Sequence, residues 1–355
     1  MAVLGSGAAM LLLAGTVCLT SGCSTLGYLG QSVGGHLDLM QRARPVDQWL
    51  ADGSTAEPLK RKLSASQRMR AFAVHELKLP DNASYTRYAD IGRPAVVWNV
   101  VAAPELSLKL KTWCFPVMGC VGYRGYFDKA GADALGAELR AQGWEVDVYG
   151  VPAYSTLGWT NWLGGDPLLS TFIGWPEGEV ARLVFHELAH QVVYAADDTA
   201  FNESFAVAVE RIGGNRWLAQ EGDAQQVRDF EATQQRREAF RALTLRARTA
   251  LDALYKEANL DDAAKRQRKA EVMAQMRADY ARLKADWGGY AGYDPFIARA
   301  NNASLAVQGA YNDLVPDFER LFERCDRDFD RFYREVKRLA ALPKDERHAT
   351  LRAPH

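Results

Sequence analysis

One short stretch, His186-Glu187-Leu188-Ala189-His190, constrains this chain more than any other, because it forms the pattern His-Glu-x-x-His. In an α-helix, residues four apart lie one above the other on the same face. His186 and His190 would therefore offer two imidazoles to one ion, at the roughly 2.0–2.1 Å of a Zn–N bond. Glu187 follows the first histidine and would reach a water molecule on that ion without binding the ion, as a general base must.

The sequence before the motif favours a helix. Pro176 lies just before it, and Glu177 and Glu179 suit a helix N-terminus. The competing interpretation is a buried helix that happens to carry two histidines. A second stretch begins in the same way at His75, but the residue four positions later is Leu79. That stretch has one possible ligand, and we interpret it as an ordinary helix.

A second helix after the motif would supply the third protein ligand that a zinc site needs. Thr199 is a candidate N-cap, and an apolar stripe that starts at Phe201 ends at Gly213-Gly214. Two helices joined by a short turn can pack antiparallel. Such packing would bring Glu203 back over the two histidines.

The choice of third ligand has alternatives. No histidine lies between His190 and His348, so a third histidine close downstream is excluded. Glu210 lies about two helical turns beyond Glu203 on the same face and is the competing ligand. Asp197-Asp198, in the predicted turn, is a remoter candidate.

The combination of His-Glu-x-x-His with Asn202-Glu203 on a second helix resembles the gluzincin metallopeptidases, the class of thermolysin and the zinc aminopeptidases. In that class the glutamate at the position of Glu203 is the third zinc ligand. The class often uses a Tyr or His from a later helix to stabilise the oxyanion, and Tyr311 is the positional candidate here, with a core tyrosine as the alternative. The sequence departs from the class in its spacing, because only residues 191–202 separate His190 from Glu203, which requires a tight turn.

The resemblance narrows to a family of bacterial proteins known as predicted aminopeptidases and covers nearly the whole chain. It implies a zinc-dependent hydrolase of peptide bonds in peptide or protein substrates. One Zn²⁺ per chain would be held by His186, His190 and Glu203, with Glu187 as the base. The expected activity is that of an aminopeptidase; the alternatives are an envelope metallo-endopeptidase and a non-catalytic metal-binding or structural lipoprotein. The stretches that carry the resemblance are Ala153–Trp159, Asp166–Leu168, His186–Gln191, Phe201–Glu203 and Asn301–Ala303.

Residues 1–22 are predicted to be a lipoprotein signal peptide. The apolar run from Met10 to Val17 is too short to span a bilayer, and Leu19–Cys23 resembles the lipobox of bacterial lipoproteins. The resemblance implies that Cys23 is acylated and anchors the chain to the membrane. Ser24 favours the outer over the inner membrane, on the periplasmic side of the bacterial cell envelope. The alternative is a plain secretory signal with a stray Cys23.

The net charge and the cysteine content limit which other functions the chain could have. The formal net charge of −1 gives no electrostatic case for binding nucleic acid. Three of the five cysteines lie outside the signal and the anchor. In an oxidising periplasm Cys114 and Cys120 could pair and leave Cys325 free, whereas three unpaired thiols are the alternative.

Hydrophobic periodicity and the resemblance together predict an α+β fold. This fold would be a zincin-like metallopeptidase core with a small mixed β-sheet, an active-site helix pair and a mostly helical C-terminal part that includes a long helical hairpin. The class implies that an edge strand binds the substrate backbone, and Ala153–Gly158 is the candidate, with a covering loop as the alternative. A helix is expected over Asp128–Gln142. The predicted strands are Ala95–Val101, Leu106–Leu110, Val117–Tyr126, Trp144–Tyr149 and Ala153–Leu157.

Shifts in composition divide the chain into five segments. The hairpin is expected to break near Asn259–Asp262, and its mixed charge favours a solvated surface over a binding surface. The predicted segments are 1–22, the signal peptide; 23–90, helical; 91–222, the α+β zinc-peptidase core with the His-Glu-x-x-His helix; 223–287, the charged hairpin; and 288–355, a helical part that completes the core.

Overall fold

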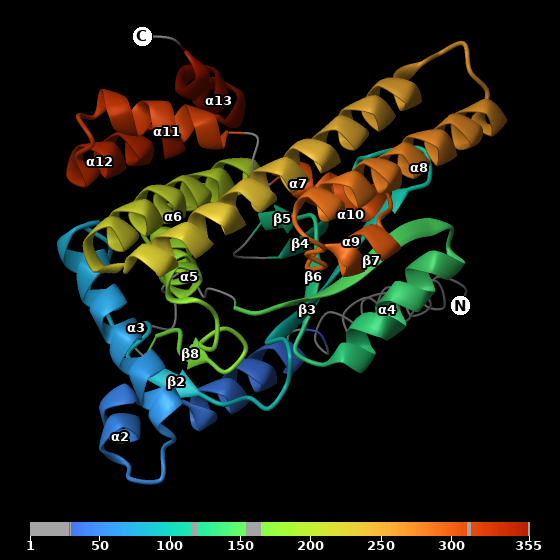
Figure 1. The fold of residues 1–355 in the computed structure, drawn as a ribbon. Helices are drawn as coiled ribbons and strands as arrows, with labels where there is room; N and C mark the ends of the chain where they lie inside the picture. Colours follow the sequence, from blue (N-terminus) through green and yellow to red (C-terminus); the bar gives the residue numbers. More distant parts are fainter. Residues whose placement is uncertain (1–27, 29, 116–118, 154–164, 311–313, 354–355) are drawn as a thin grey trace, which may run out of the picture.

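The structure is a computed structural model that describes residues 28, 30–115, 119–153, 165–310 and 314–353 (Figure 1). Within these ranges the chain has an α+β fold in which helices predominate and the strands form three small sheets, as the sequence predicts. None of the helices in the described ranges combines the length and the apolar character needed to cross a bilayer. The predicted signal peptide lies outside the described residues.

A central helix pair is surrounded by the main hydrophobic core. The two helices are α5 (Glu177–Ala189) and α6 (Thr199–Glu221), which lie in the left half of the view in Figure 1. Apolar side chains at helical spacing make the core; Phe205 of α6, for example, packs against Phe318 and Phe332. The helices that pack around the pair are α3 (Glu57–His75), α11 (Val315–Arg324), α12 (Phe329–Ala340) and α13 (Lys344–Arg352).

The limits of α6 differ from the prediction at both ends. Asp198, and not Thr199, is the N-cap, because its carboxylate accepts the N–H of Phe201. The helix continues through Gly213-Gly214 to Glu221 and does not end at the glycines. A Cβ on Gly213 would lie 2.6 Å from Leu77 Cδ1 and 2.9 Å from Phe185 Cδ2. The glycines therefore permit close packing of α5 against α6, and they were wrongly predicted to end the helix.

The central sheet is antiparallel, in the order β6-β3-β7, and is covered on both faces (Figure 1). Along β3, Val100 and Ala102 face α4, whereas Val101 and Ala103 face α10. This alternation is the two-residue period of a strand buried on both faces. The elements are β3 (Val97–Pro104), β6 (Arg124–Tyr126), β7 (Trp144–Val151), α4 (Lys129–Ala141) and α10 (Asn302–Ala310).

One predicted strand is wrong and another is interrupted. Leu106–Leu110 is a loop: Leu108 packs against a cluster of helical residues, and Leu110 packs against a cluster that contains Val101 and Ala103 of β3. The predicted strand Val117–Tyr126 is broken at Gly122: β5 (Gly119–Val121) pairs with β4 (Trp113–Phe115), whereas β6 pairs with β3. Residues 154–157 of the last predicted strand lie outside the described residues.

The β4-β5 hairpin is closed by a disulfide between Cys114 and Cys120, which confirms the pairing over the alternative of three free thiols. Cys325 is unpaired. A disulfide of this kind is typical of an oxidising compartment.

The N-terminal part is mainly helical, as predicted, with residues 30–42 in a helix followed by α2 (Val46–Ala51). It also contributes β1 (Arg44–Pro45) and β2 (Arg87–Ala89), which the periodicity did not indicate. Together with β8 (Leu168–Leu169) they form a mixed sheet in which β2 pairs antiparallel with β1 and parallel with β8.

The long helical hairpin consists of α7 (Ala224–Lys256) and α8 (Asp262–Asp286), and its turn lies where the sequence predicts (Figure 1). Asp223 and Gln226 form a capping box at the start of α7. The hairpin buries a second hydrophobic cluster against α9 (Asp294–Arg299) and α10, with Phe240 and Tyr280 among its members. It is therefore solvated on its outer faces only.

Candidate metal centre

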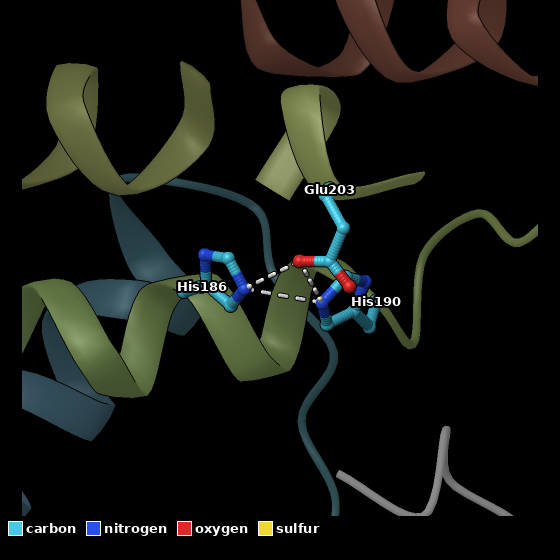
Figure 2. Close-up of side chains that lie close together, drawn as sticks. All are labelled: His186, His190 and Glu203. Atoms are coloured by element: carbon cyan, nitrogen blue, oxygen red, sulfur yellow. Dashed lines mark hydrogen bonds and ion pairs between the residues drawn. The ribbon is translucent and has the colours of Figure 1, made fainter. Parts of the chain in front are cut away.

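His186, His190 and Glu203 meet at the interface between α5 and α6 (Figure 2). The Nε2 atoms of the two histidines lie 3.2 Å apart. One carboxylate oxygen of Glu203 lies 3.4 Å from Nε2 of His186 and 3.7 Å from Nε2 of His190. Three side chains that could each donate one ligand atom therefore converge on one point, and all three are largely buried.

Local sequence explains how α5 presents the two histidines. Glu177 and Glu179 lie in its first turn, where carboxylates complement the helix dipole. His190 is the C-cap residue, and its N–H donates to the carbonyl of His186 at 3.3 Å. The spacing of four residues is thus kept through the end of the helix, and both imidazoles lie on one face.

The loop between α5 and α6 is held by Asn202. Its side-chain oxygen accepts the N–H of Ala195, and its amide donates to the carbonyl of Ala195, both at 2.8 Å. Asn202 is buried and satisfies backbone groups that the tight turn would otherwise leave unpaired. In this chain the asparagine beside Glu203 therefore shapes the turn.

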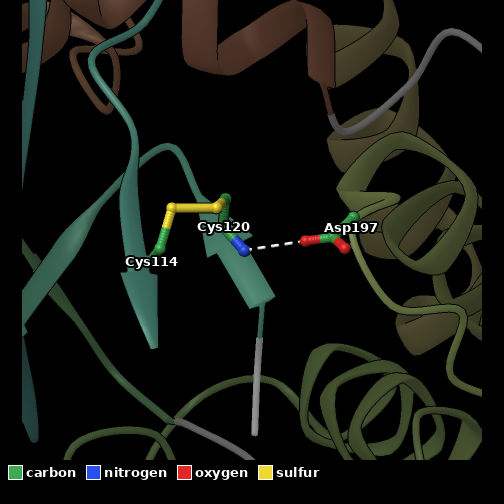
Figure 3. The surroundings of a disulfide bond; sticks show 3 residues. All are labelled: Cys114, Cys120 and Asp197. Atoms are coloured by element: carbon green, nitrogen blue, oxygen red, sulfur yellow. Dashed lines mark hydrogen bonds between the residues drawn. A yellow bond between two sulfur atoms is a disulfide. The ribbon is translucent and has the colours of Figure 1, made fainter. Parts of the chain in front are cut away.

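Asp197, a remoter candidate ligand, has a different contact. Its backbone is in the left-handed region at φ +60°, which Asp tolerates better than most residues. Its carboxylate accepts the N–H of Cys120 at 2.8 Å, so the disulfide-closed hairpin is attached to the loop that joins the two site helices (Figure 3).

Asp198, the other remote candidate, is fully buried and faces the C-terminal helix α13. Arg347 donates to its carboxylate at 2.6 Å, and Nε2 of His348 lies 2.9 Å from it. Asp198 therefore caps α6 and binds α13, and neither aspartate belongs to the histidine cluster.

Glu210, the competing ligand, lies behind His186. One of its oxygens is 2.9 Å from Nδ1 of His186, and the other accepts a hydrogen bond from the buried Arg182. Glu210 thus contacts the histidine nitrogen that faces away from Glu203. Arg182 was not predicted from the sequence, although its position four residues before His186 places it on the same helix face.

The two histidines differ in their electrostatics. Burial lowers the pKa of His190 to about 4, so its imidazole is neutral at pH 7. Burial also opposes charge on His186, but the carboxylates of Glu203 and Glu210 outweigh it and hold its pKa well above the usual value. A cation that binds Nε2 of His186 would compete with a proton for that atom.

The pKa values of the three glutamates at the site are shifted in opposite directions. Burial opposes ionisation of Glu210, yet Arg182 and His186 lower its pKa to about 2. Burial likewise opposes ionisation of Glu203, but His190 and His186 hold its pKa below the usual value. For Glu187, burial dominates and raises the pKa to about 7, assisted by nearby carboxylates. A carboxyl group poised near neutral pH suits proton transfer.

Tyrosines near the cluster were not singled out by the sequence. Burial and the charge of Glu203 raise the pKa of Tyr123 well above its usual value, and the same two causes act on Tyr194. Tyr123 lies next to the break in a predicted strand and carries no motif that would mark it. Tyr311, the predicted oxyanion residue, lies outside the described residues.

The buried Nδ1 of His190 has no hydrogen-bond partner in the part of the chain that the structure describes. A histidine that binds a metal through Nε2 usually donates a hydrogen bond from Nδ1. The two histidines therefore differ in how their rings are held, since only Nδ1 of His186 has a carboxylate beside it.

These features define a class: an α+β protein in which two packed helices bring two histidines and a glutamate together in a group that could bind a metal ion. The chain belongs to the family described as "Putative aminopeptidase", whose model matches residues 27–351. The family name indicates a peptidase. Searches of the curated proteins and of the solved structures found no match.

Proposed function

We propose that the chain is a zinc-dependent peptidase of the gluzincin type, with one Zn²⁺ held by His186, His190 and Glu203. The observation that carries this proposal is the spacing of the three ligand atoms, 3.2, 3.4 and 3.7 Å. In a tetrahedral site with bonds of about 2.0–2.2 Å, neighbouring ligand atoms lie roughly 3.3–3.6 Å apart. The observed spacing of the three ligand atoms is compatible with a zinc ion bound between them.

The donor set supports zinc as well. Two imidazoles and one carboxylate are the ligands of many catalytic zinc sites, which keep a fourth position for water or substrate. Zinc bound there would supply Lewis-acid activation of water and of the scissile carbonyl. The rest of the chemistry belongs to the side chains of this protein.

Glu187 is the residue that would move protons. It is next to His186 in the chain, is buried, and is not one of the three clustered ligands. Its carboxylate would accept a proton from the attacking water and pass that proton to the leaving amine. Without a metal ion, burial raises the pKa of this carboxyl to about 7, which supports a role in proton transfer near neutral pH.

The family name supports an aminopeptidase over an endopeptidase. The experiment that tests the function is a panel of substrates on zinc-loaded protein: aminoacyl fluorophores with a free α-amino group, their N-acetylated counterparts, and internally quenched peptides. An aminopeptidase cleaves the first set and spares the second. Cleavage of the quenched peptides at internal bonds would establish the endopeptidase alternative. If zinc-loaded protein cleaves none of the three sets, the remaining hypothesis is a non-catalytic metal-binding lipoprotein.

We also propose that the protein is anchored in the bacterial envelope through Cys23, on the periplasmic side of the outer membrane. The lipobox-like Leu19–Cys23 and Ser24 support this proposal, and so does the Cys114–Cys120 disulfide, since such bonds persist in oxidising compartments. Native protein should fractionate with membranes, and Cys23→Ser should not be processed before residue 23. A soluble, unlipidated mature form of the native sequence would refute the anchor.

A further inference from the structure

A row of alternating charges runs from the helical hairpin to His186. Arg237 of α7 donates to Glu179 at 2.6 Å, and Glu179 lies 3.8 Å from Arg182, both on α5. Arg182 donates to Glu210 of α6, whose second oxygen is 2.9 Å from Nδ1 of His186. Three helices therefore contribute to one chain of contacts that ends on the imidazole.

The middle of this row is fixed in place. The side chain of Arg182 is 4% exposed, and a Cβ on Gly214 would lie 2.6 Å from its Cγ. Phe230 of α7 lies beneath its guanidinium, 5.7 Å from the ring centroid. Gly178 is in turn so close to Phe230 that a Cβ there would lie 2.9 Å from the ring. Arg182 is thus enclosed by α5, α6 and the first helix of the hairpin.

The row of charges ends on Nδ1 of His186, and this has a chemical consequence. A histidine that binds a cation through Nε2 carries its proton on Nδ1, and the acceptor of that proton sets the plane of the ring. Glu210 is this acceptor for His186. Arg182 donates a hydrogen bond to Glu210, so the position of Glu210 depends on Arg182. Arg182 is attracted to Glu179 across 3.8 Å without a hydrogen bond, and Arg237 donates a hydrogen bond to the other oxygen of Glu179.

We propose that the hairpin belongs to the metal centre: Arg237 is a positioning residue that orients His186 through Glu179, Arg182 and Glu210. The inference rests on the proposed metal site and goes beyond it, because it assigns a role to a helix that holds none of the proposed ligands. Zinc affinity is then coupled to how α7 sits on α5 and α6. A partner that displaced α7 would weaken metal binding.

The same helices offer a matched control. Glu238, the next residue on α7, pairs with Arg211 of α6 at 3.1 Å. This second ion pair also holds the hairpin to the site helices. Arg211 follows Glu210 in the chain, but the ion pairs that Arg211 and Glu238 form among the described residues include neither Glu210 nor His186. Glu238→Gln removes one α6–α7 ion pair and leaves the row to His186 intact.

The test is a chelator competition that measures the zinc affinity of the full chain, with thermal unfolding of each apoprotein as a check on folding. Loss of a residue that supports a metal ligand typically lowers affinity about 10–100-fold. We expect Arg182→Met to fall in this range and Arg237→Met to lose about 3–10-fold. Arg237→Lys, which keeps a cation beside Glu179, should recover most of the loss, and Glu238→Gln should match the wild type.

A spectroscopic signature separates orientation of His186 from general loosening. With Co²⁺ in place of zinc, Arg237→Met should shift the visible absorption bands that report ligand geometry, whereas Glu238→Gln should not. Equal zinc affinity and equal Co²⁺ spectra in Arg237→Met and wild type would overturn the coupling and leave the zinc site standing. A wild type that takes up neither ion would overturn the metal site itself, and the coupling with it.

Discussion

The helix pair α5–α6 and the hairpin α7–α8 are both antiparallel and both contain ion pairs, but they differ in how far those ion pairs are exposed. Between α5 and α6 the pair formed by Arg182 and Glu210 is 4% and 16% exposed. On the hairpin the pair formed by Lys256 and Asp252 is 73% and 52% exposed. Exposed pairs of this kind contribute about 0.3–0.5 kcal/mol, whereas breaking a buried pair costs roughly 3–5 kcal/mol.

The number of charged residues in a stretch of sequence therefore does not indicate a functional site, whereas burial of those charges does. Each buried charge between α5 and α6 holds a neighbour in one position, and the row of neighbours ends at His186. The charges on the outer hairpin keep that helix pair soluble.

Glu187→Gln should lower peptide hydrolysis by about 10²–10⁴-fold, because the amide cannot accept the proton of the attacking water. The variant should retain zinc, since Glu187 is not among the clustered ligands. Measurement of kcat/KM together with the metal content of the same preparation checks both parts. Loss of zinc from this variant would instead make Glu187 a ligand.

Glu203→Ala should weaken zinc binding more than Glu210→Ala. Only Glu203 has an oxygen near both Nε2 atoms, whereas Glu210 acts from behind His186. Removal of Glu210 should cost about 10–100-fold in affinity. Zinc titration of the two variants decides the order, and the reverse ranking would move the third ligand to Glu210.

Gly213→Leu should destabilise the protein by about 1–3 kcal/mol, because the new side chain has no space between Leu77 and Phe185. The matched change on the hairpin is Ala250→Leu at an exposed position of α7, which should alter stability by less than about 0.5 kcal/mol. Denaturant unfolding of both variants gives the comparison. Equal stability of the two would mean that α5 and α6 are not closely packed at Gly213.

Asp252→Asn should have the smallest effect, below about 0.5 kcal/mol in stability, and no effect on zinc affinity. It removes the partner of Lys256 on the solvent face of α7. A measurable loss of zinc affinity would show that the outer hairpin, and not only the part near Arg237, is coupled to the metal centre.

Local pattern accounts for the parts of the site that the sequence could predict. His186 and His190 are four residues apart in one helix, and the tight turn to Glu203 leaves few arrangements for the second helix. The pairing of Cys114 with Cys120 spans six residues. In each case the groups are close in the sequence, so local spacing indicates which groups can meet; the preference for Glu203 over Glu210 also needs the resemblance carried by Asn202-Glu203.

The remaining contacts join residues that are distant in the sequence, and no local pattern indicates them. Arg237 reaches Glu179 across 58 residues, and Arg347 reaches Asp198 across 149. The false strand at Leu106–Leu110 has a related cause: Leu108 packs against helices from a later part of the chain, and Leu110 packs against β3 and α10. Likewise, Gly213-Gly214 has the composition of a helix end, and only the neighbouring helix shows that it is a contact surface.

The contact between Asp198 and Arg347 also implies that the metal centre forms late in the folding of a newly made chain. Arg347 follows Asp198 by 149 positions in the chain. Until Arg347 has joined the fold, the carboxylate that caps α6 lacks the guanidinium that holds it in the finished protein. We therefore expect the cluster of His186, His190 and Glu203 to acquire its final geometry only after α13 has emerged, so metal should enter a completed chain and not a nascent one.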